Sequence, residues 1–319
     1  MQMFLLGLST LFSMVLFVRR MPGRDWQTEF HARLFKRFFK TAQRKGPQWS
    51  REMIAAQTSK SSVMERISVE PFTLADVPGL MITPQSLDPS VKRILVYFHG
   101  GGYVTGGAKG YLAFTARLAD QSQLLTYCPD YSLSPEHPFP RPQEDCYRVL
   151  TAIAVAHPEH QLIVMGDSAG GALAISSVLH GKPETRKRIA GLGLISPWVD
   201  PTADSGSIVT NVPNDMFTQE ILVESYASHM QGADPLDGRA SFVHANLANF
   251  PPMLIQVAGG EVFYDQVKDF AQRAQEAGVD CVLEEFPTQF HVFQTLAHGF
   301  PEAKQARASL ARFAAGSVA

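Results

Sequence analysis

The chain has 319 residues, of which 45% are hydrophobic and 18% are charged, and its formal net charge is −2 at pH 7. This composition suits a globular protein with one large core and excludes a disordered or low-complexity chain. The mildly acidic balance argues against a nucleic-acid-binding protein, which would need a strong positive charge. The chain has three scattered cysteines without metal-site spacing, which predicts buried thiols; they are Cys128, Cys146 and Cys281.

The N-terminus begins with an apolar run over residues 3–18, which Arg19 and Arg20 follow directly. These sixteen residues are short for a membrane span, which needs about 20. They also lack the basic region that precedes the apolar part of a secretory signal. Positive charge after the run would leave the rest of the chain on the cytoplasmic side. We therefore expect a cytoplasmic protein, with weak membrane association on the cytoplasmic face through residues 3–45.

A basic amphipathic helix is predicted over residues 24–45. Between Arg19 and Lys45, nine Lys or Arg oppose two Asp or Glu, a net charge of +7 that leaves the rest of the chain at −9. Large apolar residues recur every fourth position on one face, namely Trp26, Phe30, Leu34 and Phe38. Such a stripe fits a membrane surface or a cap packed over a site below it. For residues 24–45 the cap is the favoured interpretation.

From about residue 91, short apolar runs alternate with helical patterns. Residues 67–81 predict an antiparallel pair at one edge of the sheet. The runs 93–98 and 161–165 read as buried strands, and further strands are predicted over 191–195, 253–258 and 281–286. This alternation predicts an α/β fold with a mostly parallel central sheet flanked by helices. Residues 204–249 interrupt it and contain a helical run over 220–230.

The string His99-Gly100-Gly101-Gly102 directly follows the strand predicted over 93–98. It has the HGGG form that supplies oxyanion-hole amides in lipases and esterases. Without side chains, Gly101 and Gly102 can turn bare backbone N–H groups toward a reacting carbonyl. The string therefore predicts a site that stabilises a developing oxyanion.

A second glycine-rich string, residues 166–171, follows the strand predicted over 161–165. Gly166-Asp167-Ser168-Ala169-Gly170 has the G-x-S-x-G form of a nucleophile elbow, and a helix is predicted to follow it. The Ala169 amide, at the head of that helix, would gain from the helix dipole. Both strings, in the order that the chemistry needs, predict acyl transfer to Ser168.

A serine nucleophile needs a histidine base and an acid, in the chain order Ser, acid, His. His291 lies in the turn after the strand predicted over 281–286, from which a base can project. His298 is expected on the following helix or at its end, as a surface residue. By chain order the acid should therefore lie between Ser168 and His291, where Glu261 and Asp265 both stand. The string Asp234-Pro235-Leu236-Asp237 lies in the same interval, so chain order alone does not choose the acid.

These features resemble the hormone-sensitive-lipase-like group of α/β-hydrolases, which are mostly bacterial carboxylesterases. The resemblance runs from about Val91 to Ala303. The strings that carry it, besides the two glycine-rich ones, are Asp130-Tyr131-Ser132-Leu133-Ser134-Pro135-Glu136, Ile195-Ser196-Pro197-Trp198-Val199-Asp200 and His291-Val292-Phe293-Gln294. The resemblance implies His291 as the base. It implies Glu261 as the acid, where many relatives have Asp, with Asp265 as the runner-up.

The resemblance also implies an α/β-hydrolase fold with a helical cap. Residues 61–203 and 250–319 would form the catalytic domain, and residues 204–249 would join part of residues 1–60 in the cap. The supporting residues would be His99, Gly100 and Asp167, and the pocket residues Tyr103 and Trp198. A homodimer through the edge strand over 281–286 follows from the same analogy.

The expected function is a serine carboxylic-ester hydrolase that acts on short- to medium-chain acyl esters through an acyl-enzyme on Ser168. No metal or organic cofactor is required. A lactone or an amide or formamide hydrolase would use the same triad. A ligand-binding protein on this scaffold is a further alternative, as in plant hormone receptors that resemble the family but lack the catalytic histidine. Here Ser168 and His291 are both present.

Overall fold

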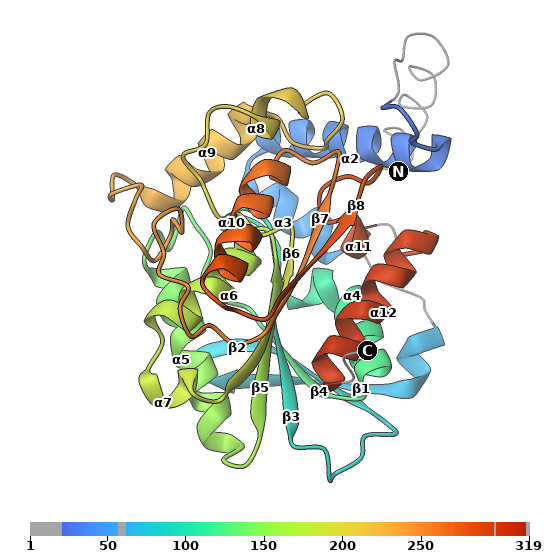
Figure 1. The fold of residues 1–319 in the computed structure, drawn as a ribbon. Coiled ribbons are helices and arrows are strands. Elements are labelled where there is room, and N and C mark those ends of the chain that lie inside the picture. Colours follow the sequence, from blue (N-terminus) through green and yellow to red (C-terminus); the bar gives the residue numbers. More distant parts are fainter. Residues whose placement is uncertain (1–20, 57–61, 297, 317–319) are drawn as a thin grey trace.

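The computed structural model describes residues 21–56, 62–296 and 298–316 (Figure 1). Within them, eight strands form one sheet in the order β1-β2-β4-β3-β5-β6-β7-β8. The strands are β1 Ile67–Leu74, β2 Val77–Pro84, β3 Arg93–Phe98, β4 Leu125–Pro129, β5 Gln161–Asp167, β6 Ile189–Ile195, β7 Met253–Ala258 and β8 Cys281–Phe286. β1 and β2 pair antiparallel, β2 is antiparallel to β4, and the remaining neighbours are parallel. The predicted mostly parallel sheet and its antiparallel edge pair are confirmed.

Helices cover both faces of the sheet. α4 and α12 pack on one face and α5, α6 and α10 on the other, while α2, α8 and α9 lie above its upper end in Figure 1. The helices are α2 Trp26–Lys45, α3 Pro47–Ala55, α4 Ala108–Ser122, α5 Arg141–Ala156, α6 Ala169–His180, α7 Pro183–Arg186, α8 Ser207–Thr210, α9 Gln219–Met230, α10 Tyr264–Glu276, α11 Phe293–Leu296 and α12 Pro301–Ala315, with a short 3-10 helix over Ser62–Arg66.

The strands are apolar on both faces because each face meets a layer of helices. In β3, Ile94, Val96 and Phe98 join the core beneath α5, α6 and α10. Leu95 and Tyr97, which alternate with them, join the core beneath α4 and α12. Side chains of successive strand residues point to opposite faces, so one short run supplies both cores.

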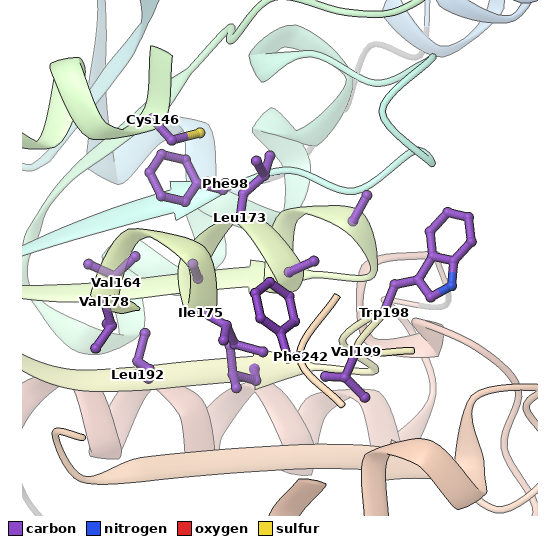
Figure 2. Close-up of a cluster of buried hydrophobic side chains, with 14 of the residues drawn as sticks. Phe98, Cys146, Val164, Leu173, Ile175, Val178, Leu192, Trp198, Val199 and Phe242 are labelled. Carbon is purple, nitrogen blue, oxygen red and sulfur yellow. The ribbon is translucent and has the colours of Figure 1, made fainter. Parts of the chain in front are cut away.

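Figure 2 shows part of the first core, in which side chains of α6 pack against those of β3, β5 and β6. Phe242 also enters this cluster, and its amide donates a hydrogen bond of 3.0 Å to the carbonyl of Val199. Phe242 lies within residues 204–249, the segment predicted as a cap insertion. The later part of that segment therefore packs into the core, while α8 and α9 lie at the cap end.

The N-terminal helix α2 packs over the carboxyl end of the sheet. It begins after Asp25, whose Oδ1 accepts a hydrogen bond of 2.9 Å from the amide of Thr28. Phe38, on its aromatic stripe, is 4% exposed, whereas Trp26 at its start is 41% exposed. Phe30 and Leu34, the other two residues of the stripe, are half-buried, so the stripe is covered toward its C-terminal end and exposed at its start. The apolar run over 3–18 lies outside the described residues, and no described helix has the length and apolarity to cross a bilayer.

Candidate active site

Four loops meet at one edge of the sheet, because parallel strands bring their carboxyl ends together. The loop after β3 carries Gly101 and Gly102, and the turn after β5 carries Ser168. Glu261 follows β7, and His291 follows β8. Residues far apart in the sequence therefore come to one place, with α2, α3 and α9 above them.

Ser168 stands on a sharp turn between β5 and α6. Its backbone has φ 53° and ψ −121°, a conformation that a serine seldom adopts without support from its surroundings. That support comes from β6 and the segment after it: the Ser168 amide donates to the Ile195 carbonyl (2.9 Å), and the Trp198 amide donates to the Ser168 carbonyl (3.0 Å). A Cβ at Gly170 would lie 2.1 Å from the Phe98 carbonyl oxygen, so only glycine permits this approach of helix and strand.

His291 and Glu261 form a buried pair beside the nucleophile turn. The His291 Nδ1 and Glu261 Oε2 atoms lie 3.5 Å apart, and both side chains are fully buried. The hydroxyl of Ser196 donates a hydrogen bond of 2.6 Å to the same carboxylate oxygen. The Nδ1 to Oε2 separation is longer than a formed hydrogen bond; such contacts tighten in the substrate complex. His291 Nε2 has no hydrogen-bond partner among the described residues, and His291 lines the same cavity as Ser168.

Burial and the neighbouring polar groups act in opposite directions on the pKa of His291 and on that of Glu261. Burial disfavours protonation of His291, but the nearby Glu261 carboxylate outweighs it, with help from the charges of Asp215 and Asp167, and the pKa of His291 is raised. Burial raises the pKa of Glu261, against the lowering effects of His291 and Ser196. The geometry favours a base that is oriented by a carboxylate and retains a proton well once it has accepted one.

The structure separates the two candidate acids. Glu261 lies beside His291, whereas Asp265 accepts a hydrogen bond of 2.7 Å from the Ser207 amide at the start of α8. The Ser207 hydroxyl in turn accepts one of 2.9 Å from the Asp265 amide. Asp265 therefore fixes α8 to α10 and is not brought to the imidazole.

The surface position predicted for His298 was wrong. His298 lies just after the end of α11 and before α12, is half-buried, and lines the cavity that Ser168 also lines. Burial, with the positive charges of Arg117 and Arg307, lowers the pKa of His298 to about 4. The surface position was predicted because the local sequence does not show that the chain after α11 returns to the cavity.

The loop after β3 presents two free amides. Gly101 and Gly102 have φ values of 121° and 61°, which favour glycine. Neither amide donates a hydrogen bond to another residue in the described part of the chain, and both glycines line the cavity. Ala169, the first residue of α6, is buried beside Ser168. The amides of Gly101 and Gly102 are thus available as hydrogen-bond donors in the cavity of Ser168, and Ala169 remains a predicted third donor.

Asp167 holds this loop in place from beneath. Its Oδ1 accepts hydrogen bonds from the Gly100 amide (2.9 Å) and the Tyr97 hydroxyl (2.8 Å), and its Oδ2 accepts one from the Tyr111 hydroxyl (2.8 Å). A Cβ at Gly100 would lie 2.2 Å from Oδ2. Burial raises the pKa of Asp167 to about 6, although the three donors oppose that shift.

His99 braces the other side of the same loop. Its Nδ1 donates a hydrogen bond of 2.9 Å to the Gly100 carbonyl, so Nδ1 carries the proton. Its ring stacks on Tyr131 with centroids 4.3 Å apart, and the Tyr131 hydroxyl donates to the His99 carbonyl at 2.6 Å. His99 is buried away from the cavity lining and serves as a support.

A cavity of about 580 Å³ opens above Ser168. This volume is within the range of small-molecule sites. Its apolar walls come mainly from α2, the segment before α9, and α9 itself; they include Phe35, Phe38, Phe39, Met216, Phe217, Ile221 and Leu222. Trp198 lines it, as expected. Tyr103 does not belong to the described lining: it is buried and stacks on His229, with ring centroids 3.9 Å apart.

Three residues of the site escaped the sequence analysis as functional candidates. Ser196 belongs to a string that carried the family resemblance, so its position offered a signal. Tyr111 lies on α4 and meets Asp167 across 56 residues of sequence. Asp215 lies in the insertion, and its partners are 47 and 76 residues away, which leaves no local pattern to find.

Comparisons with known proteins agree with this geometry. Residues 95–295 match the family model described as the alpha/beta hydrolase fold. The chain is 32% identical over 251 residues to an esterase of Acinetobacter venetianus, covering 78% of this chain and 82% of that protein. It is 31% identical to an acetyl-hydrolase of Streptomyces hygroscopicus, over 67% of this chain and 72% of the relative.

Solved structures extend the likeness to almost the whole chain. An esterase from the bacterial hormone-sensitive lipase family has a TM-score of 0.76 at 26% identity, covering 98% of this chain and 97% of its own. A mutant of the esterase E40 has a TM-score of 0.82 at 27% identity, covering 93% and 100%. The chain belongs to the alpha/beta hydrolase fold family. Within that family it is a carboxylesterase of the hormone-sensitive-lipase type, and the predicted fold and enzyme class are confirmed.

Proposed function

We propose that this carboxylesterase hydrolyses short- to medium-chain acyl esters through an acyl-enzyme on Ser168. One observation carries the proposal: Ser168, His291, Gly101 and Gly102 line a single cavity, and Glu261 lies directly behind the imidazole. This arrangement supports the roles of nucleophile, base, orienting acid and oxyanion donor that acyl transfer requires.

In the first half-reaction, His291 Nε2 takes the proton of the Ser168 hydroxyl while Oγ attacks the acyl carbonyl. The amides of Gly101, Gly102 and Ala169 hold the negative oxygen of the tetrahedral intermediate. The intermediate collapses to the acyl-enzyme, and His291 gives its proton to the leaving alcohol. Water then attacks the acyl-enzyme with His291 again as the base, which releases the acid. Glu261 keeps the imidazole in the required tautomer and stabilises its charged form.

The residues that line the cavity support the proposal that the substrates carry short- to medium-chain acyl groups. The lining above Ser168 is dominated by aromatic and aliphatic side chains, and a volume of about 580 Å³ accommodates more than an acetyl group. Each additional buried methylene contributes about 0.8 kcal/mol to binding. Acetyl esters, which the name of the Streptomyces relative suggests, and esters a few carbons longer are therefore the proposed substrates.

Hydrolysis of p-nitrophenyl esters from acetyl to dodecanoyl tests the proposal. We expect the highest kcat/KM at short to medium chains for the wild type and loss of activity in Ser168→Ala. Ser177→Ala is a matched control on the same helix, because that buried hydroxyl has one hydrogen bond within the described part of the chain, to the Leu173 carbonyl (2.8 Å). A folded wild type without activity on any of these esters would overturn the proposal, as would full activity in Ser168→Ala.

A further inference from the structure

Asp215 joins two of the loops that carry the reacting groups. It lies between α8 and α9 and is 1% exposed. Its Oδ1 accepts a hydrogen bond of 3.0 Å from the His291 amide, and its Oδ2 accepts one of 2.9 Å from the Val262 amide. One carboxylate therefore spans the loop of the base and the loop of the acid, since Val262 directly follows Glu261.

Arg24 contacts the base loop and the segment that carries Asp215. Its guanidinium is buried and donates to the carbonyls of Thr288 (2.7 Å) and Gln289 (3.0 Å), which precede His291 in its loop. It also donates to the carbonyl of Asn214 (2.6 Å), the neighbour of Asp215. An arginine before α2 thus ties the base loop to the segment between α8 and α9.

A third tether runs from the same segment to the acid loop. The amide group of Asn211 donates to the carbonyls of Gly259 (3.2 Å) and Glu261 (3.0 Å). The acid loop and the base loop are consequently held by residues that lie outside the sheet, on the two chain segments that also line the cavity.

We propose that Asp215, with Arg24, is a positioning residue that fixes the His291 imidazole relative to Glu261 and Ser168. The inference rests on the proposed function of those three residues. Asp215 bonds backbone amides only, so its action is indirect: it sets where the loops stand. A displacement of about 1 Å in a reacting group can cost on the order of 100-fold in rate. The segment between α8 and α9, together with Arg24 before α2, therefore sets the position of the His291 side chain.

The negative charge of Asp215 has a second, measurable effect, which is on the protonation of His291. His291 is surrounded by three carboxylates, those of Glu261, Asp215 and Asp167, and all three favour its protonated form. The positive charges of Arg24 and Lys36 interact with Asp215. The same two cations also interact with Glu29. Neutralising Asp215 removes one of the negative charges around the imidazole and should lower the pH at which His291 titrates.

The test is Asp215→Asn in the full chain. The substituted amide keeps the size of the side chain but turns an NH₂ group toward one of the two backbone donors. We expect kcat to fall on the order of 100-fold with KM nearly unchanged. We also expect the apparent pKa in kcat/KM to fall by about half a unit or more. Arg24→Met should lower kcat in the same way.

Asp145→Asn is the matched control. Asp145 is also a buried carboxylate that accepts a hydrogen bond from a backbone amide, that of Ser132 at 2.9 Å, but it lies on α5 and belongs to none of the catalytic loops. It should lower the melting temperature without moving the pH profile. If Asp215→Asn only loses stability, with kcat and the pH profile as in the wild type, Asp215 is merely structural and the proposal is overturned.

A titration of the His291 ring by NMR separates this proposal from the proposed function. The His291→Gln variant assigns the signal. A lower His291 pKa in Asp215→Asn supports the positioning role even if the wild type hydrolyses none of the test esters. An unchanged titration in a protein that does hydrolyse them contradicts the positioning role and leaves the proposed function intact.

Discussion

Asp167 is a buried carboxylate whose charge the fold tolerates poorly. Burial raises its pKa from 3.8 to about 6, despite three hydrogen-bond donors. The folded state therefore binds a proton more tightly than the unfolded state does, and this residue's contribution to stability is fully present below about pH 4. It is lost as the pH rises through the folded-state pKa.

Replacing the ionisable group should remove that dependence. We expect the wild type to lose about 2 kcal/mol of stability, relative to Asp167→Asn, between about pH 4.5 and pH 7.5, since one pKa unit corresponds to about 1.4 kcal/mol. Denaturant unfolding of both proteins at the two pH values measures the difference. Parallel pH dependence in the two proteins would show that Asp167 has an ordinary pKa in the folded state.

Glu261 and Asp265 offer a direct choice between two carboxylates four positions apart. Glu261→Gln should lower kcat by about 10³- to 10⁴-fold, because the neutral amide no longer stabilises the imidazolium or fixes its tautomer. Asp265→Asn should mainly destabilise the protein, since its carboxylate bonds the Ser207 amide. Steady-state kinetics of both variants tests which carboxylate orients His291. A larger fall in kcat for Asp265→Asn than for Glu261→Gln would identify Asp265 as the acid.

At the residue scale, the groups that stand in motifs are predictable, including the supports His99 and Asp167. Supporting residues outside the motifs, such as Tyr111 and Asp215, are not. Ser168 and the glycine strings follow strands directly, so their local pattern predicts their place. His298 and Tyr103 were misplaced because their surroundings depend on how α9 and the chain after α11 fold back. Ser196, which bonds Glu261, owes its role to the neighbouring strand.

Among the elements, α2 and α9 shape the cavity above Ser168. Phe39 on α2 lines this cavity, and its ring lies 4.9 Å from that of Phe217, which in turn lies 5.1 Å from the His291 ring. Phe39 thus reaches the His291 ring through the ring of Phe217.

Shortening that side chain should enlarge the cavity. Phe39→Ala is expected to shift the preferred ester toward longer acyl chains, with relative kcat/KM changing about fourfold for each methylene that gains a place, or about 0.8 kcal/mol. The chain-length series with p-nitrophenyl esters measures it. Phe30→Ala, on the same helix but outside the described cavity lining, should keep the wild-type preference; an unchanged preference in Phe39→Ala would contradict this account of the cavity.

The strands of the parallel sheet were predictable because each is a short, nearly continuous apolar run. β4 is the exception among the parallel strands: the short sequence Leu125-Thr126-Tyr127-Cys128-Pro129 is less distinctive. The helical runs in α2 and α9 were also predictable. Their placement over Ser168 was implied only by the family resemblance, because it depends on contacts between segments far apart in the sequence.

For the whole molecule, β8 is an edge strand of the sheet, as predicted, and the homodimer remains a prediction. Val282 on β8 is 47% exposed. Glu284 and Glu285 bond partners within their own chain, among them Gln256 (2.7 Å) and Tyr264 (2.5 Å), which moderates repulsion between two copies of the strand. If β8 forms the interface, Val282→Lys should convert a dimer to a monomer of 35.1 kDa. Light scattering measures the mass, and a wild type at the monomer mass contradicts the prediction.

The most direct test of the account is to trap the acyl-enzyme. The wild type is mixed with p-nitrophenyl acetate, quenched in acid during turnover and digested, and the peptides are weighed by mass spectrometry. We predict one added acetyl group on the peptide that contains Ser168, and none in Ser168→Ala. An acetyl group on a different residue during turnover, or undiminished hydrolysis by Ser168→Ala, would contradict the assignment of Ser168 as the nucleophile.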